Sequence, residues 1–385
     1  MLQIPAIVHG LLAISAMNLL LFSALVRGRY YNVFLYSHIV GSIVLPIALI
    51  LHRQATHPWV FAALGLYGLD YLFRTLKTRV CSAILRPIPE LGITRVEIPH
   101  LNAGWRPGQH VRLRVLSTGV GIFGWAEIHP FTISSVTGDG LTLMVKKAGD
   151  WTTKLHNMAT KNDAIYSGGW GAEKKVKVWI EGPYGGVGNT MMDSYSGAVF
   201  MVGGSGITFA LSSITDLVQK DAEGCSRLKI IHLIWSIQDP GTCSPLCWAM
   251  TIADPIQASL QPMIPTFAAL LQQVTSVSLL ISVHYTRASM FKVKKAYPRL
   301  PPRLTITPGR PKLVTAIGSV VDYVCRSYPP SGREYDATDR PTGVFVGVCG
   351  PVGLGDEARR AVGAIDPTRF QNVGGIEIVE ETFGW

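Results

Sequence analysis

Charged side chains are scarce in this chain of 385 residues: Asp, Glu, Lys and Arg make up 16% of it, and hydrophobic residues make up 48%. Soluble domains usually carry about 25% charged residues. The shortage is local, because residues 1–73 are almost free of charge and residues 90–385 have an ordinary globular composition. This distribution excludes an ordinary cytosolic enzyme and predicts a membrane portion followed by a soluble portion.

Paired cysteines are also missing. The six cysteines are spread along the chain without a C-x-x-C motif, and Cys243 and Cys247 have no second pair with which to complete a zinc site. The pattern excludes a disulfide framework and favours a reducing compartment for the soluble portion.

Acidic residues are outnumbered, with 25 Asp and Glu against 35 Lys and Arg, which gives a formal net charge of +10. The basic residues are scattered and no nucleic-acid-binding motif accompanies them, so nucleic acid is not an expected partner. Anionic membrane lipid and phosphate-bearing cofactors account for the excess better.

Long apolar runs open the chain. Residues 4–26 and 33–51 carry no charge and are long enough to span a bilayer, whereas residues 58–73 form a weaker run that would need residues 60–76 to span with tilt. The first run could instead be a signal peptide, but it has no basic start and a second run follows closely. We therefore predict transmembrane helices.

Basic residues flank these runs on one side. Arg27 and Arg29 separate the first two runs, and Arg74, Lys77 and Arg79 follow the third. Because positive residues favour the cytoplasmic side, both clusters and the soluble portion are predicted to be cytosolic.

Two histidines stand on the second run. His38 and His52 are 14 residues apart, so in a helix they share a face about 21 Å apart along the axis. Ionisable residues within a span are functional candidates, and this pair could hold two haem irons. The alternative is a pair of helix-end histidines that hydrogen-bond or snorkel. His9 is interpreted as a packed or capping residue, and Asp70 as a partner of Arg74.

The soluble portion begins with short strands and then changes pattern. Apolar or alternating segments at 94–98, 109–116, 131–136 and 141–147 predict a small antiparallel barrel. From about Ala198, strands alternate with helical segments, which predicts an α/β nucleotide-binding domain. The expected elements are strands at 228–235, 278–283, 344–348 and 375–379 and helices at 207–220 and 357–364.

Two strand ends in the predicted α/β domain carry residues that could bind a ligand. The glycines of Gly203-Gly204-Ser205-Gly206 lie between a strand and a helix, where backbone N–H groups can bind a pyrophosphate. Cys349-Gly350-Pro351 closes another strand, at the edge where an α/β sheet binds its ligands. The alternative at both places is an ordinary tight turn.

Two further motifs lie in the barrel. His129-Pro130-Phe131-Thr132 offers a hydrogen-bond donor, an aromatic face and a hydroxyl, unless it is a plain barrel strand. The segment from Lys146 to Thr153 offers cations, a glycine turn and hydroxyls at a helix start, which suits a phosphate, unless the lysines form a solvated edge.

The order of these motifs resembles the ferric reductase and NADPH oxidase family. Six features follow one another along the chain: H-P-F-T, K-K-x-G-D-W-T, G-P-Y-G at 182–185, G-G-S-G-I-T, C-G-P and an aromatic carboxyl terminus. The ending E-T-F-G-W is most similar to the fungal metalloreductase branch. The resemblance implies an α-helical membrane segment and a ferredoxin–NADP reductase-like module. Its parts would be residues 1–78, part of the haem domain; 79–190, the FAD-binding barrel; and 191–385, the NAD(P)H-binding domain.

The resemblance implies a role for each matching residue. The flavin would be held by His129, Pro130, Phe131 and Thr132, and its phosphates by Lys146, Lys147, Gly149, Trp151 and Thr152. The nicotinamide nucleotide would be held by Gly182, Pro183, Tyr184, Gly185, Gly203, Gly204, Gly206, Thr208, Gly350 and Pro351. Cys349 would lie near the nicotinamide C4, Phe383 or Trp385 would stack on the flavin, and Arg310 would bind the NADPH 2′-phosphate unless it is a surface arginine. His38 and His52 would each hold a haem b iron.

The implied activity is NADPH-dependent reduction of a metal chelate across a membrane, most simply the plasma membrane. Alternatives are a superoxide-producing oxidase, a haem-free anchored diaphorase, and a non-enzymatic remnant. The chain begins within what would be the family's fourth span, so an N-terminally truncated member is expected, with further haem ligands from a second copy or a full-length homologue. Residues 236–239, which follow the expected strand at 228–235, lack the arginine that is common there in this family. Residues 243–275 resemble an apolar insertion.

Overall fold

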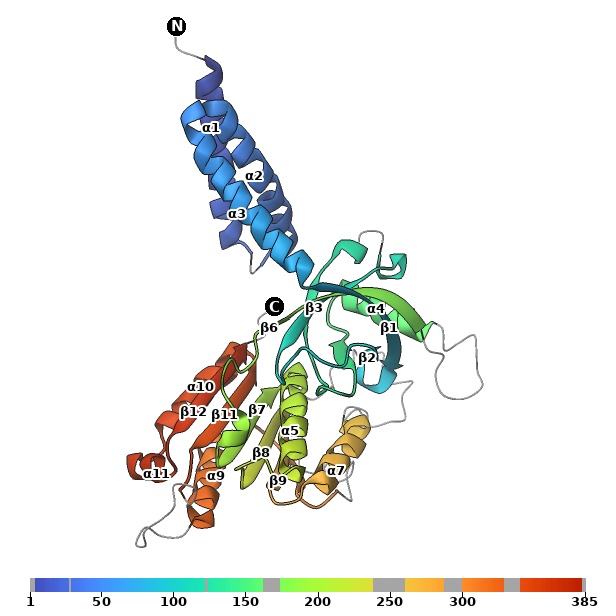
Figure 1. Ribbon diagram of the computed structural model, residues 1–385, viewed down its shortest axis with the longest axis vertical. Coiled ribbons are helices and arrows are strands. Elements are labelled where there is room, and N and C mark those ends of the chain that lie inside the picture. Colours follow the sequence, from blue (N-terminus) through green and yellow to red (C-terminus); the bar gives the residue numbers. More distant parts are fainter. Residues whose placement is uncertain are drawn as a thin grey trace. The chain divides into compact units, whose positions relative to one another are not determined.

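The computed structural model describes residues 4–27, 29–121, 124–161, 174–237, 260–286, 300–328 and 340–382. The chain separates into two compact units, Met1–Thr78 and Arg79–Trp385. Each unit is described by itself below (Figure 1).

The first unit is helical throughout its described core. Its α-helices are α1 (Ile4–Leu25), α2 (Tyr31–His52) and α3 (His57–Leu76). Among the described residues, two helical segments, Pro5–Leu25 and Val33–His52, are long and apolar enough to cross a membrane. That the third run crosses a membrane stays a prediction, because α3 is not one of this pair. It carries Asp70 and Arg74, which form the predicted i,i+4 ion pair at 2.9 Å.

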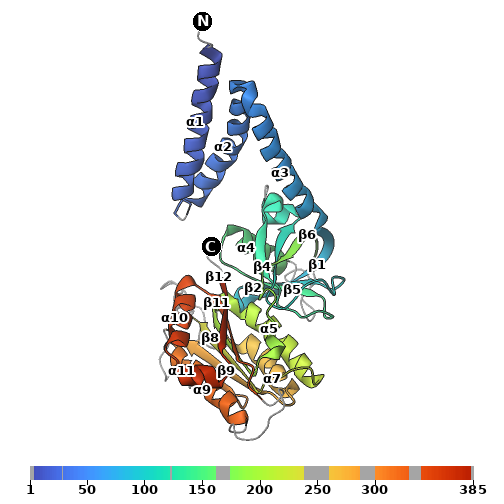
Figure 2. The same cartoon turned by 60° about the vertical axis from the view of Figure 1, so that its left-hand side comes forward.

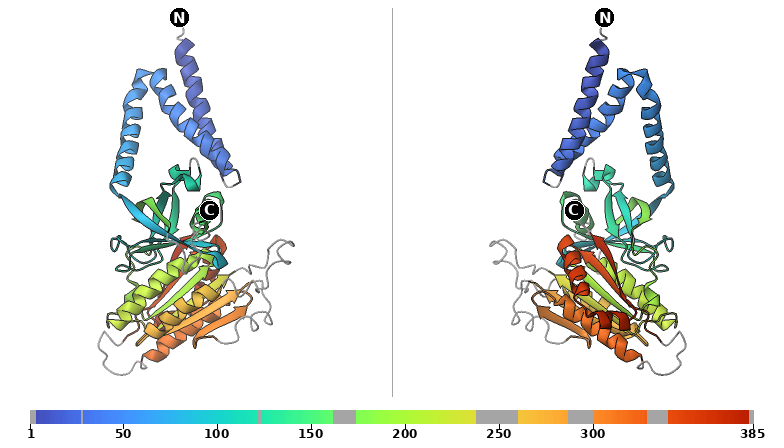
Figure 3. Two further views of the ribbon diagram at one scale, coloured as in Figure 1. Left: turned by 90° about the vertical axis from the view of Figure 1, so that its right-hand side faces the viewer. Right: turned by 90° about the vertical axis from the view of Figure 1, so that its left-hand side faces the viewer.

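Small residues let α1 and α2 pack side by side, as both panels of Figure 3 show. Gly41 of α2 lies so close to Leu20 that a Cβ on the glycine would come within 2.8 Å of the leucine Cγ. Ala16 and Ala48 are buried. Small side chains at helix contacts are the usual means of bringing two membrane helices close together.

The second unit starts with an antiparallel barrel. Its strands run in the spatial order β4-β3-β6-β1-β2-β5, and an isolated bridge between Ile133 and Leu143 links the two ends. Alternate residues point inward, so Leu85, Leu113, Leu143 and other apolar side chains fill the barrel. The elements are β1 (Thr78–Ile88), β2 (Ile93–Ile98), β3 (His110–Val115), β4 (His129–Thr132), β5 (Leu141–Lys146), α4 (Asp150–Thr160) and β6 (Lys174–Tyr184).

A parallel sheet follows, in the order β10-β9-β8-β7-β11-β12. Helices cover both faces, with α5 and α7 on one side and α9, α10 and α11 on the other (Figure 2). The barrel and the α/β domain expected from the sequence are confirmed. The elements are β7 (Gly197–Gly203), α5 (Ile207–Ala222), β8 (Ile230–Ile237), α7 (Ile264–Gln273), β9 (Ser278–Tyr285), β10 (Leu304–Pro308), α9 (Leu313–Ser327), β11 (Val344–Gly350), α10 (Val352–Gly363), α11 (Pro367–Asn372) and β12 (Ile376–Thr382).

Some expected boundaries were wrong. Helix α10 begins at Val352, directly after Pro351, rather than at 357. The described end of the apolar 243–275 segment is α7, whose Phe267 and Leu270 are buried in the core beside the sheet. Its apolar composition thus reflects core packing, and residues 243–259 lie outside the described residues.

A buried carboxylate ties the end of α5 to the start of β9. Asp221 accepts hydrogen bonds from the backbone N–H groups of Thr275 and Ser276, at 3.0 Å each, and from both side-chain hydroxyls. Burial alone would raise the pKa of Asp221, but the hydrogen bonds from Ser276 and Thr275 outweigh it and lower the pKa to about 2. The charged carboxylate therefore stabilises this corner.

We predict that Asp221→Asn weakens this corner by about 2 kcal/mol at pH 7, because a depressed folded-state pKa contributes stability above the unfolded value. That contribution is lost as the pH falls from about 4 to about 2. Hydrogen exchange of residues 274–285 should accelerate in the variant. Asp216→Asn is the control, because Asp216 pairs with Lys220 at the surface. Equal exchange in the two variants would contradict the prediction.

Candidate functional site

The predicted flavin motif lies on β4, above a buried tryptophan. The rings of His129 and Phe131 lie 4.4 and 6.2 Å from the ring of Trp151, centroid to centroid. Trp151 is 3% exposed, and its Nε1–H donates to the Gly124 carbonyl at 3.0 Å. The one side-chain donor of Trp151 is thus already used, and its ring packs against His129 and Phe131. That Trp151 contributes to a phosphate site stays a prediction.

The amino end of α4 presents the predicted phosphate site. Thr152 Oγ1 accepts hydrogen bonds from Ala148 N–H at 3.0 Å and Gly149 N–H at 2.9 Å, so its side chain shapes the turn. A Cβ on Gly149 would meet nothing within 4 Å, which leaves open space in front of the helix. Lys146 and Lys147 are exposed beside it. An open helix amino end flanked by lysines suits a phosphate.

The glycine loop of the α/β domain is a short 3₁₀ turn, Gly204–Gly206, between β7 and α5. Gly204 has φ +54°, which favours glycine, and its carbonyl accepts a hydrogen bond from Trp235 Nε1–H at 3.0 Å. Thr208 Oγ1 donates to the Ser205 carbonyl at 3.1 Å. The hydrogen bonds from Trp235 and Thr208 thus fix the conformation of the loop. Ser205 is exposed.

Gly206 lies in close contact with the backbone and side chain of Cys349. A Cβ there would come within 2.3 Å of the Cys349 carbonyl oxygen and 2.9 Å of its Sγ. Gly203 likewise lies against Pro351, where a Cβ would come within 3.1 Å of the proline Cδ. The two predicted motifs, from β7 and β11, are therefore brought into direct contact at the carboxyl edge of the sheet.

Cys349 is fully buried beside a residue that sequence reasoning missed. In the pairing of β11 with β12, Cys349 stands opposite Glu381. Burial and the nearby Glu381 carboxylate raise the pKa of the Cys349 thiol. Burial raises the pKa of Glu381 as well, although the hydrogen bond from Gly186 N–H opposes it. The sequence signal for this residue is its place in the E-T-F-G-W ending, two residues before Phe383.

The G-P-Y-G motif occupies the end of β6 and the following turn. Glu181 Oε1 accepts hydrogen bonds from Arg112 Nη1 at 3.1 Å and from the Tyr184 hydroxyl at 2.8 Å. The Arg112 guanidinium lies 5.2 Å from the centre of the Tyr184 ring. Burial and Arg112 lower the pKa of His110, which contacts Gly185. Glu181 and Arg112, which lie outside the sequence motifs, thus hold the Tyr184 side chain in place.

Two seams join the barrel to the α/β sheet within the second unit. Gly108 N–H donates to Ser212 Oγ at 3.1 Å, and Phe209 fills the space where a Cβ on Gly108 would be. At the other seam, Gly186 N–H donates to Glu381 Oε1 at 2.6 Å. The turn after G-P-Y-G therefore faces the strand end that carries Glu381 and its neighbour Cys349.

The remaining predicted residues fall elsewhere. Arg310 is exposed just past the carboxyl end of β10, the edge strand of the sheet. Phe383 and Trp385 lie outside the described residues, so their predicted stacking stays a prediction. His38 and His52 both lie on α2, in the first unit.

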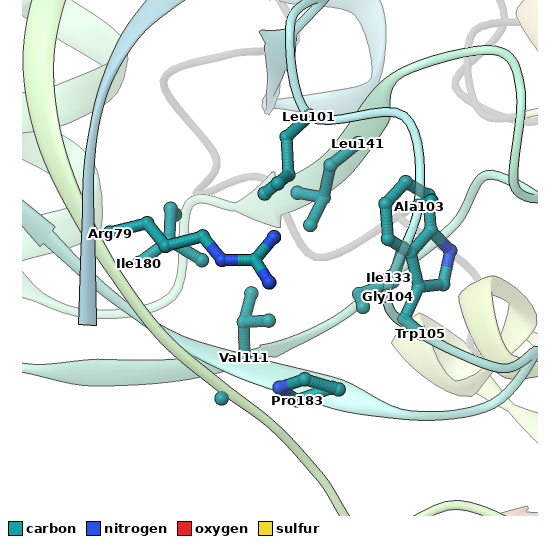
Figure 4. A pocket seen from close by; sticks show the side chains of 11 residues that line it. Arg79, Leu101, Ala103, Gly104, Trp105, Val111, Ile133, Leu141, Ile180 and Pro183 are labelled. Atoms are coloured by element: carbon teal, nitrogen blue, oxygen red, sulfur yellow. The ribbon is translucent and has the colours of Figure 1, made fainter. Parts of the chain in front are cut away.

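A small cavity lies at one end of the barrel, where Arg79 extends toward Val111, Leu101 and Leu141 (Figure 4). Its volume is about 10 Å³, enough for about one water molecule. The cavity is therefore a packing gap, and the flavin motif on β4 and α4 remains the candidate cofactor site.

We predict that the Cys349 thiol reacts with iodoacetamide at least tenfold more slowly than Cys225 in the folded chain. Only the thiolate is nucleophilic, and burial both hides Cys349 and raises its pKa, whereas Cys225 is exposed. Mass spectrometry of alkylated peptides over time measures both rates, with the unfolded chain as the control. Similar rates in the folded chain would contradict the buried, protonated thiol.

Comparison with known proteins agrees with this geometry. Residues 90–187, which include β4 and α4, match the FAD-binding domain family. Ferric reduction oxidase 8, mitochondrial, of Arabidopsis thaliana is 29% identical over 243 residues, which cover 60% of this chain and 31% of that protein. A probable cell surface ferric reductase of Aspergillus oryzae is 26% identical over 245 residues, covering 57% of this chain and 30% of that protein.

Human dual oxidase 1 is 29% identical over 222 residues, covering 54% of this chain and 13% of that protein. The matches thus span about a third of the two ferric reductases and less of the oxidase. The ordered motifs, the matched FAD-binding domain and relatives of both kinds support a member of the ferric reductase and NADPH oxidase family.

Proposed function

We propose that this chain is a membrane-bound NADPH-dependent metalloreductase, which uses FAD and haem b to reduce a ferric or cupric chelate on the outer side of a membrane. The observation that carries the proposal is the meeting of Gly206, Cys349 and Glu381 at the edge of the sheet that faces the G-P-Y-G turn. It supports the proposal because the glycine loop and a buried thiol lie at the edge of the sheet that is joined to the barrel.

The residues present fit FAD. His129 and Phe131 offer half-buried rings over Trp151, which can support a flavin ring, and the open amino end of α4 beside Lys146 and Lys147 suits its phosphates. When bound, FAD takes a hydride from the nicotinamide and releases the electrons singly. The chain's part is to orient the two rings and to keep water out.

The residues also fit a nicotinamide nucleotide. Backbone N–H groups at Gly204–Gly206 would bind the pyrophosphate, and exposed Arg310 would bind the 2′-phosphate that distinguishes NADPH. Cys349 would border the nicotinamide as a neutral thiol, since its pKa is raised. Burial raises the pKa of Glu381 at the same edge, and the hydrogen bond from Gly186 N–H opposes this.

The helical unit fits a haem ligand at one position. His52 Nδ1 lies 2.7 Å from the Ala6 carbonyl oxygen and donates to it, which leaves Nε2 with the lone pair that binds iron. His38 is exposed on the same helix. The proposed orientation takes α3 as a third span, which brings Arg27, Arg29 and the second unit to the same side of the membrane, the cytosol. The cell surface ferric reductase among the relatives favours the plasma membrane.

A second candidate is reduction of dioxygen to superoxide, which the match to human dual oxidase 1 favours. Both candidates share the cytosolic half-reaction and differ in the final acceptor. Ferric-chelate reduction that continues without oxygen supports the first, and superoxide formation that metal chelates do not suppress supports the second.

We predict that the purified full chain, supplied with FAD and haem, bleaches its flavin absorption when NADPH is added without oxygen, and that reduced-haem bands follow. Visible spectroscopy measures both signals. Bleached flavin without haem bands would confine the activity to an anchored diaphorase. No bleaching with FAD bound would contradict the proposal and favour a non-enzymatic nucleotide-binding chain.

We predict that His52→Ala lowers the haem bound per chain by at least half, because it removes one iron ligand. His57→Ala is a matched control, since His57 Nε2 also bonds a backbone carbonyl, that of Ile50, at 2.8 Å. Haem content is measured by the pyridine haemochrome spectrum. Equal losses in the two variants would assign His52 a structural role only.

A further inference from the structure

His110 lies where the flavin motif and the G-P-Y-G motif meet, and the proposed function gives it no role. Strand β3 lies between β4 and β6, and His110 of β3 stands opposite Thr132 of β4 and opposite Tyr184 of β6. Residues directly opposite each other point to the same face of a sheet, so the three side chains form one row. The rings of His110 and Tyr184 are 6.1 Å apart, centroid to centroid.

The same imidazole borders the carboxyl edge of the α/β sheet. A Cβ on Gly185 would come within 3.0 Å of His110 Nδ1 and within 3.4 Å of Glu381 Oε1, so both atoms border one small space. Gly185 has φ +61°, which favours glycine, and the ring occupies the room that a side chain there would need. Glu381 in turn stands opposite Cys349 in the pairing of β11 with β12. The imidazole thus lies between the barrel motifs and the buried thiol.

The proposed reaction leaves a proton in this part of the chain. A hydride brings two electrons and one proton, and the electrons then leave singly for metal ions or haem. Each NADPH and two one-electron acceptors therefore yield NADP⁺, two reduced acceptors and one proton. A base of the chain has to bind this proton and pass it to water, and a side chain that titrates near the working pH does this best.

The neighbouring side chains narrow the choice of base. Burial raises the pKa of Cys349, so this thiol already holds its proton. The Tyr184 hydroxyl donates to Glu181, which also accepts from Arg112. Burial and then Arg112 lower the pKa of His110, so its imidazole is neutral at pH 7. A neutral imidazole keeps one nitrogen lone pair, with which it can accept a proton.

We infer that His110 is the base that takes up, at Nε2, the proton left by each hydride and returns it to water. Nε2 is the ring nitrogen that does not face Gly185. An N–H bond forms there as the electrons leave, and it breaks when the half-buried ring gives the proton to solvent. Glu381, the other titratable group at this space, already accepts the Gly186 N–H at 2.6 Å. The inference rests on the proposed function and adds a proton acceptor to it.

The test separates the two half-reactions of the full chain loaded with FAD. The flavin is reduced without oxygen, by NADPH or by dithionite, and is then reoxidised by ferricyanide, which takes single electrons, in a stopped-flow spectrometer. His110→Gln should slow reoxidation at least tenfold, whereas bleaching by NADPH should change less than twofold, because a hydride needs no base. Added imidazole should restore part of the lost rate. His100→Gln, which changes an exposed histidine just after β2, is the matched control and should alter neither step.

The pH dependence identifies the base. Reoxidation in the unchanged chain should slow as the pH falls through the lowered pKa of His110, because only the neutral imidazole accepts a proton. That step should be missing in His110→Gln. Burial raises the pKa of Glu381, so a step that persists in the variant would assign the proton to this carboxylate and overturn the inference. NMR of ¹³C-labelled histidine reads the same titration without turnover, and the signal lost in His110→Gln is that of His110.

A variant of the same shape separates proton uptake from packing. His110→Phe keeps a ring against Tyr184 but binds no proton, so it should slow reoxidation as much as His110→Gln does. Equal slowing of both half-reactions, without rescue by imidazole, would make His110 a packing residue and overturn the inference. Flavin that NADPH does not bleach, but whose reoxidation after dithionite depends on His110, would refute the proposed function alone. Bleaching and reduced haem with reoxidation independent of His110 would refute this inference alone.

Discussion

The approach of Gly206 to Cys349 is the contact on which the rest of the site depends. Because a side chain at position 206 would overlap the Cys349 carbonyl, the turn between β7 and α5 can lie directly against the end of β11 only if it is glycine. That contact brings the amino end of α5 and the buried thiol to the same edge of the sheet. A parallel sheet then adds Glu381 to this edge, because β12 runs in the same direction as β11.

The same edge also joins the two halves of the second unit. Glu381 stands beside Cys349 and accepts the hydrogen bond from Gly186. Phe209, the residue directly after Thr208 of the glycine motif, fills the space beside Gly108. Residues close to the glycine loop and to Cys349 thus also join the α/β domain to the barrel. A change in either seam would shift the glycine loop relative to the motifs on β4 and α4.

The sequence was a good guide to elements and a poorer guide to roles. Trp151 belongs to a motif that the family resemblance links with phosphates, yet it lies buried with its indole N–H bonded to Gly124. Thr152 belongs to the same motif, and its hydroxyl accepts hydrogen bonds from two amides of its own turn. For these two residues the sequence identified the position but not the contacts. The third apolar run forms a helix with the expected Asp70–Arg74 ion pair, but it is not among the two helices that are long and apolar enough to cross a membrane.

The sequence by itself determined the order of the parts: apolar helices, a barrel, then an α/β domain with glycines after its first strand. These features are set by local properties, namely the spacing of apolar residues and the freedom of glycine, and such properties can be read along the chain. Only the tertiary structure decided that Glu381 meets Gly186, that Glu181 joins Arg112 to Tyr184, and that Arg114 stacks on Trp179. Those contacts depend on strand register and domain packing between residues far apart in sequence, where no local pattern carries the information.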